Sequence, residues 1–190
     1  MNKQIIIVVF VLFLAPVVVA TLLHSQWFSW QPGGTRNHGE LIQPVIALPE
    51  FSLHDAFGQP LSRDDLLDQW QLVHWRSEPC TQTCLEDLYW LRQVRRAQDR
   101  HQPDIGLLLL TETRIEAEFL DQILELSDTF KVVHGSEAGT LAQTFPGDEQ
   151  GQASYIVDPM ANIILGYAAD ADPNDIRRDL RRLLTWTHRD

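Results

Sequence analysis

The apolar residues of this chain fall into short continuous runs and into helical repeats, and the two kinds of pattern alternate. Residues 71–75 and 105–111 are runs of strand length, and the second is unbroken, which is typical of a strand covered on both faces in a parallel sheet. Between them, residues 79–99 repeat apolar side chains every three or four positions and predict a helix, with Pro79 suited to its first turn. The inward side of this helix is expected to carry Leu85, Leu88, Leu91 and Val94.

The same alternation continues towards the C-terminus. Residues 113–126 open with Thr-Arg-Ile-Glu, the pattern of a capping box, and predict a second helix. The element order is therefore a hairpin, three strand–helix units, a second hairpin and a last helix, which predicts an α/β domain with a central mixed sheet flanked by helices. The other expected elements are hairpins at 51–61 and 155–167, a helical turn at 64–68, a strand at 130–133, a helix at 137–144, and a last helix from Pro173 to about 186 with Asp172 as its N-cap.

A run of nineteen residues without a charge, 5–23, precedes these elements. At about 1.5 Å per residue, a helix of this length spans roughly 28 Å, close to the hydrocarbon thickness of a bilayer. Lys3 precedes the run and no Lys or Arg follows it until Arg36, so the positive-inside rule places the N-terminus in the cytoplasm and the rest of the chain outside. We expect a transmembrane helix that anchors the chain in the inner membrane; the alternative is a signal peptide cleaved after Ala20.

Composition and charge divide the chain and exclude one class of partner. Residues 1–24 are expected to form the membrane anchor, residues 25–49 a linker rich in Pro and Gly, and residues 50–190 the folded domain. The formal net charge is −11, and the two lysines, Lys3 and Lys131, leave no lysine-rich patch. Since nucleic-acid binding depends on clustered basic side chains, no nucleic-acid partner is expected.

The two cysteines, Cys80 and Cys84, lie between the strand at 71–75 and the helix that follows it. Residues four apart share a helical face, so both side chains are expected to point the same way from the first turn. Three interpretations stay open. A structural disulfide across so short a loop would stabilise the fold by about 2 kcal/mol. A redox pair would use the helix N-terminus to favour a thiolate, and a copper(I) site would use both sulfurs with a third ligand.

A cysteine pair on the first helix after the first central strand is typical of the thioredoxin-like fold. The Cys-x-x-x-Cys spacing of Cys80 and Cys84 resembles the Sco/SenC family, as do the hairpin at 51–61 and the segment Tyr155-Ile-Val-Asp-Pro159. That family consists of membrane-anchored thioredoxin-fold proteins implicated in building the copper centre of cytochrome c oxidase. The resemblance implies a thioredoxin-like domain over residues 50–190, a periplasmic location and a role in oxidase assembly.

The resemblance also implies where copper would bind and what is missing there. The third copper ligand of the family is a His several residues before the late strand, and Gln150 stands at that place in this chain. No His lies between His134 and His188. If copper is bound, the resemblance therefore implies Cys80 and Cys84 as its ligands, without the imidazole of the family.

Two classes of function stay open, and with them the question whether the protein is an enzyme. In the first, Cys80 and Cys84 cycle between dithiol and disulfide, or pass electrons or copper to an oxidase subunit or another thiol protein. In the second, the protein is a non-catalytic assembly or scaffold protein that keeps the fold and the anchor but has lost metal binding. The cysteine pair favours the first class and Gln150 the second. Our hypothesis is the first class, with thiol chemistry ahead of copper.

Overall fold

The computed structural model describes residues 3–24, 37–146 and 152–187. The chain divides into two units, Met1–Arg36 and Asn37–Asp190, and the first contains the helix α1 (Lys3–His24). In the part of the chain that the structure describes, no helix qualifies by length and apolar character as a membrane span. Residues 5–23 do form a helix within α1, and the expectation that it crosses a membrane stays a prediction.

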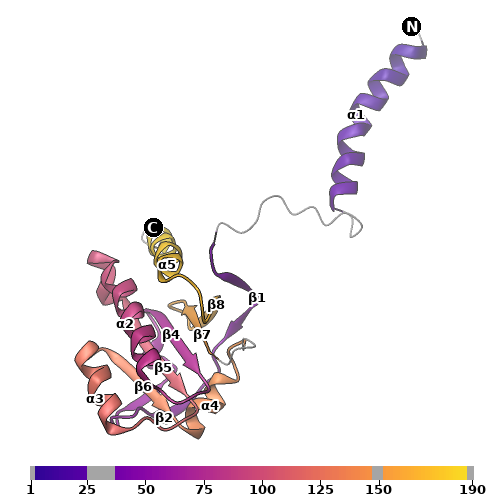
Figure 1. Ribbon diagram of the computed structural model, residues 1–190. Coiled ribbons are helices and arrows are strands. Elements are labelled where there is room, and N and C mark those ends of the chain that lie inside the picture. The colour runs from indigo at the N-terminus through magenta and orange to yellow at the C-terminus, as the bar shows by residue number, and fades with distance from the viewer. Residues whose placement is uncertain (1–2, 25–36, 147–151, 188–190) are drawn as a thin grey trace. The chain divides into compact units, whose positions relative to one another are not determined.

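A mixed sheet forms the centre of the second unit (Figure 1). Within the described residues it has six strands in the order β1-β8-β7-β4-β5-β6. β4, β5 and β6 run parallel, whereas β7 pairs antiparallel with β4, β8 with β7, and β1 with β8. This is the mixed central sheet that the order of elements predicts. Its strands are β1 (Glu40–Ala47), β4 (Trp70–Arg76), β5 (Ile105–Thr111), β6 (Phe130–His134), β7 (Gln152–Val157) and β8 (Asn162–Ala168).

Helices cover both faces of the sheet and divide the core into two layers. On one face, Leu88, Ile123 and Leu180 from α2, α3 and α5 pack against alternate residues of the strands. On the other face, α4 and a two-stranded hairpin pack against the intervening residues. The bounds of these elements are α2 (Gln82–Arg96), α3 (Ala117–Leu126), α4 (Ser136–Ala142), α5 (Pro173–Thr187), β2 (Ser52–His54) and β3 (Pro60–Ser62), with the 3-10 turns η1 (Asp64–Leu66) and η2 (Asp99–Asp104).

The expected strands, hairpins and helices are present, but some of them begin or end at other residues than expected. The capping box at the start of the second helix is wrong, because Thr113 Oγ1 donates to the Ser77 carbonyl at 3.2 Å and α3 begins only at Ala117. The N-cap of the last helix is confirmed, since the Asn174 N–H donates to Asp172 Oδ1 at 2.8 Å.

The second half of the expected linker belongs to the folded domain. β1 forms an edge of the sheet, where Leu41 lies opposite Leu165 of β8. The register shifts between Leu41 and Ile46, around the cis peptide bond before Pro44. Proline is tolerated in an edge strand because its missing N–H need not meet a partner strand. The shift hides the alternation of apolar residues, which is why the sequence pattern predicted a linker here.

Candidate functional site

Cys80 and Cys84 form a disulfide, with an S–S distance of 2.04 Å and a Cα–Cα distance of 5.1 Å. Their expected placement is half right. Thr81 is the N-cap of α2 and has an extended backbone, so Cys84 lies in the first turn whereas Cys80 lies in the loop before the helix. The helix begins at Gln82 rather than at the expected Pro79, because the backbone of Thr81 is still extended, with φ −119° and ψ −170°.

The two cysteines are both buried but differ slightly in their exposed fraction. Cys80 is 6% exposed and Cys84 is completely buried, and both belong to the apolar core beneath α2. A thiol partner therefore has to approach at Cys80. If the disulfide opens there, the sulfur that leaves is Cys84, at a helix N-terminus where the helix dipole favours a thiolate.

The loop that carries Cys80 is held by the end of the neighbouring parallel strand. Thr111 Oγ1 donates to the Glu78 carbonyl at 3.4 Å, and Thr113 Oγ1 donates to the Ser77 carbonyl. The Thr113 N–H in turn donates to Thr111 Oγ1 at 3.3 Å. The disulfide thus lies at the carboxyl ends of β4 and β5, and two hydroxyl groups fix the backbone that leads into it. The sequence shows these threonines but not which carbonyls they reach.

His134, a candidate third ligand by residue type, has a different partner. Its Nδ1 accepts a hydrogen bond from the Ile115 N–H at 3.1 Å, which ties the end of β6 to the segment before α3. Burial, and then the charge of Arg114, lower the pKa of His134. His134 therefore acts here as a neutral acceptor that positions a loop.

A buried polar cluster lies between α2 and the sheet, and the sequence patterns did not predict it. His74 Nδ1 is 3.0 Å from Ser154 Oγ, while its Nε2 is 3.7 Å from Asp87 Oδ2. Arg76 Nη1 approaches the same carboxylate oxygen at 3.7 Å. His74 and Arg76 occupy positions of β4 that face α2, on the side where Leu72 joins the core. His74 and Arg76, two polar residues at alternate positions after the apolar Leu72 and Val73, were the available signal.

Burial sets the charges of this cluster. It lowers the pKa of His74 to about 4, with the positive charge of Arg76 acting in the same direction. It also raises the pKa of Asp87, which Arg76 opposes. At neutral pH His74 is therefore neutral. Asp87 follows Cys84 by three residues, so the two share a face of α2. A cavity of about 50 Å³ is lined by His74 and Asp87.

The described side chains do not fit a three-ligand copper site. Among them, no three His, Cys, Asp or Glu residues gather so that they could hold a metal ion. Two sulfurs need a third donor for such a site, and Gln150, at the position expected for that donor, lies outside the described residues. The expectation for Gln150 stays a prediction, and no step of the function proposed below passes through copper.

Fold and disulfide together define a thioredoxin-like protein. The family model of the transmembrane-like, thioredoxin-like, C-terminal domain matches residues 70–187, more than half of the chain, so the protein belongs to this family. No curated protein matches the chain.

Solved structures with the same fold include Sco proteins. The apo Sco1 protein from Thermus thermophilus has a TM-score of 0.62 and 16% identity, covering 79% of this chain and 99% of that one. Arabidopsis thaliana ScoI with copper bound has a TM-score of 0.59 and 13% identity, and the match covers 73% of this chain and 98% of that one. The thioredoxin domain of a thiol-disulfide oxidoreductase from Bacteroides vulgatus has a TM-score of 0.54 and 16% identity. The match covers 72% of this chain and 94% of that one. The resemblance to Sco proteins is thereby confirmed at the level of the fold.

Proposed function

We propose that this protein exchanges a dithiol and a disulfide at Cys80 and Cys84 with a partner protein, outside the cytoplasm, during assembly of a respiratory oxidase. The observation that carries the proposal is the disulfide itself, formed at the N-terminus of α2 and at the carboxyl end of β4. Cys80 keeps a small exposed fraction of 6% while Cys84 is completely buried, so Cys80 is the sulfur that a partner thiol can approach.

The exchange needs only the two sulfurs and a dithiol partner. A partner thiolate attacks Cys80 Sγ, a new S–S bond joins the two proteins, and the Cys80–Cys84 bond breaks with Cys84 leaving as a thiolate. The second partner thiolate then attacks the first partner sulfur and releases Cys80. The partner has lost two electrons and two protons and holds a disulfide, and Cys80 and Cys84 have gained both. The reverse sequence oxidises Cys80 and Cys84.

The proposed location is the periplasmic side of the inner membrane. Disulfides persist outside the cytosol, and the described apolar side chains of α1, such as Phe10, Leu12 and Phe13, are exposed. Lys3 before the apolar run supports a cytoplasmic N-terminus. We propose that α1 attaches the chain to the lipid bilayer. An alkaline phosphatase fused after Asp190 should then be active and sediment with membranes, and an inactive fusion would contradict this orientation.

The proposed partner is an oxidase subunit or another thiol protein. The support is the fold that this chain shares with the Sco proteins and with the thioredoxin domain of a thiol-disulfide oxidoreductase. The test is to trap the partner. Cys84→Ser leaves Cys80 without its resolving thiol, so a mixed disulfide should accumulate in cells, whereas Cys80→Ser should trap far less because Cys84 is buried. Equal trapping by both variants, or none by either, contradicts the proposal.

A scaffold without thiol chemistry is the second candidate. The complete burial of Cys84 favours it, since a buried disulfide is typical of a structural bond. The double variant Cys80→Ser/Cys84→Ser separates the two functions. A scaffold should still support oxidase activity in cells once the variant is folded, whereas a thiol-exchange protein should not.

A further inference from the structure

A groove lies between α2 and α3, and neither cysteine is among its lining residues. Its volume is about 630 Å³. Leu85 and Leu126 form apolar parts of its lining, and the aromatic side chains of Tyr89 and Trp90 stand beside them. Tyr89 is 41% exposed and Trp90 51% exposed, with their rings in edge contact at 5.4 Å between centroids. Two adjacent aromatic residues exposed on one helix are characteristic of surfaces that bind another protein.

The charge of the groove has one sign. Glu86 of α2 and Glu125 of α3 both line it and both are exposed, while Gln82 and Gln122 supply amide groups. No Lys or Arg belongs to this lining. A Lys or Arg placed here would lie near a carboxylate from each helix and near two aromatic rings, whose faces attract cations.

One end of the groove lies at the first turn of α2, which carries Cys84. Gln82 and Leu85, which line it, flank Cys84 in the first turn of α2, and Trp90 lies eight residues after Gln82. At about 1.5 Å per residue this part of α2 is roughly 12 Å long. An extended segment of about four residues covers that length. A partner whose cysteine reaches Cys80 can therefore lay the residues beside that cysteine along the groove.

We propose that this groove binds the segment next to the reactive cysteine of the partner, and that this segment carries Lys or Arg beside an apolar side chain. The inference rests on the proposed thiol exchange and names the class of partner. Charge complementarity selects this occupant: an anionic membrane surface would be repelled by Glu86 and Glu125. A second copy of this chain is the other candidate occupant, and light scattering distinguishes it from a partner segment.

The test compares two ten-residue peptides with one cysteine each, identical except for two Lys or two Glu residues that flank a Leu beside the cysteine. The full chain, in a neutral detergent, is mixed with each peptide, and the rate of mixed-disulfide formation at Cys80 is followed by mass spectrometry after acid quenching. Each rate is divided by the rate of the same peptide with the neutral 2-hydroxyethyl disulfide, which removes differences in thiol reactivity. We expect the Lys peptide to react about tenfold faster than the Glu peptide, as two exposed ion pairs allow.

Matched variants assign the preference to the groove. Glu86→Gln/Glu125→Gln should remove most of the difference between the peptides, and Tyr89→Ala should slow the Lys peptide. Glu50→Gln/Asp170→Asn makes the same change in net charge at exposed positions outside the groove and should leave the preference intact. Equal loss in both double variants would assign the preference to the overall charge and overturn the proposal.

Neutral dithiothreitol distinguishes the failure of this inference from the failure of the proposed function. If dithiothreitol does not open the Cys80–Cys84 disulfide in the folded protein, the thiol-exchange function is wrong. If it opens the disulfide and both peptides react alike, the function stands and the groove inference is wrong. A dimer in light scattering that Tyr89→Ala dissociates would show that a second copy fills the groove, and would also overturn the proposal.

Discussion

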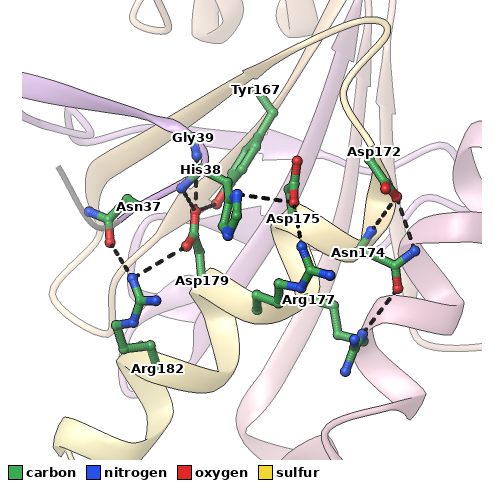
Figure 2. Close-up of polar contacts among 11 residues, drawn as sticks. Asn37, His38, Gly39, Tyr167, Asp172, Asn174, Asp175, Arg177, Asp179 and Arg182 are labelled. Carbon is green, nitrogen blue, oxygen red and sulfur yellow. Dashed lines mark hydrogen bonds and ion pairs between the residues drawn. The ribbon is translucent and has the colours of Figure 1, made fainter. Parts of the chain in front are cut away.

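Gly39 donates its backbone N–H to Asp179 Oδ2 at 2.9 Å, although 140 residues separate the two in the chain. The same oxygen accepts the N–H of His38 at 2.8 Å and the hydroxyl of Tyr167 at 3.0 Å (Figure 2). Arg182 Nη1 lies 3.7 Å from the other carboxylate oxygen. Asp179 is completely buried, so a single carboxylate of α5 holds the segment before β1 and the last strand, β8, against that helix.

Removing this carboxylate should destabilise the domain. Asp179→Ala leaves the buried donors of Gly39 and Tyr167 without their acceptor, and we expect the free energy of unfolding to fall by about 2–4 kcal/mol. Urea denaturation followed by circular dichroism measures it. Asp175→Ala is the control, because Asp175 pairs with His38 at 3.1 Å but is partly exposed, and it should cost less than about 1 kcal/mol. Equal losses of stability in the two variants would contradict the prediction that the buried carboxylate of Asp179 stabilises the domain more than that of Asp175.

Tyr167 should make the protein sensitive to alkali. Burial, and then the charge of Asp179, raise its pKa above the ordinary value of 10.0. The folded protein keeps the phenol proton that the unfolded chain releases, so this contribution to stability is complete below pH 10.0 and is lost as the pH rises above it. Tyr167→Phe should make the free energy of unfolding less dependent on pH above 10.0. An unchanged slope in urea titrations at increasing pH would contradict the prediction.

His74 should have the opposite dependence, at acid pH. Its pKa is about 4 in the folded protein against an ordinary value of 6.5, so only the unfolded chain binds the proton between these values. The contribution is complete above pH 6.5, and about 3 kcal/mol is lost as the pH falls to about 4. Asp87 opposes this loss, because its raised pKa lets the folded protein bind a proton more readily.

The titration of the His74 imidazole by NMR tests the pKa directly, and the stability of His74→Gln tests its consequence. We expect the variant to lose less stability than the wild type as the pH falls from 6.5 to about 4. The same substitution at His54, which is exposed in β2, is the control for the change from His to Gln. A pKa near 6.5 for the His74 imidazole would contradict the prediction that burial and Arg76 lower it.

Reduction of the disulfide should loosen the domain without unfolding it. The bond closes a loop of about five residues, so the chain-entropy cost of its loss is about 2 kcal/mol. The reduced protein and the Cys80→Ser/Cys84→Ser variant should therefore keep the circular dichroism of the oxidised protein and melt at a lower temperature. A double variant that fails to fold would indicate a structural bond instead.

Copper(I) binding should be weak and limited by the third donor. The reduced protein offers the thiolates of Cys80 and Cys84, and the carboxamide of Gln150 is a poor soft ligand. Gln150→His should strengthen copper(I) binding by about tenfold or more, corresponding to roughly 1.4 kcal/mol. Competition titrations with a chromogenic chelator measure the change. Tight binding by the wild type that survives Gln150→Ala and disappears in His134→Ala would place the third ligand at His134.

Local and continuous apolar patterns in the sequence were enough to predict several elements. The unbroken run that forms β5, the apolar spacing of α2 and the Asp172 N-cap of α5 all predicted their elements, because a helix or a buried strand repeats its burial at short range. The closeness of Cys80 and Cys84 was also predictable, since three intervening residues cannot carry the two sulfurs far apart.

The contacts between groups that are distant in the chain could not be predicted from the sequence and follow from the packing of the elements. Thr113 could cap its own helix or donate to the Ser77 carbonyl, and the packing of β4 beside β5 selects Ser77. The pairing of His74 with Asp87 depends on how α2 lies on the sheet, and the place of β1 depends on Asp179 at the other end of the chain. Such contacts join residues whose separation in sequence carries no periodic signal, so they arise only when the packed elements bring buried donors and acceptors together.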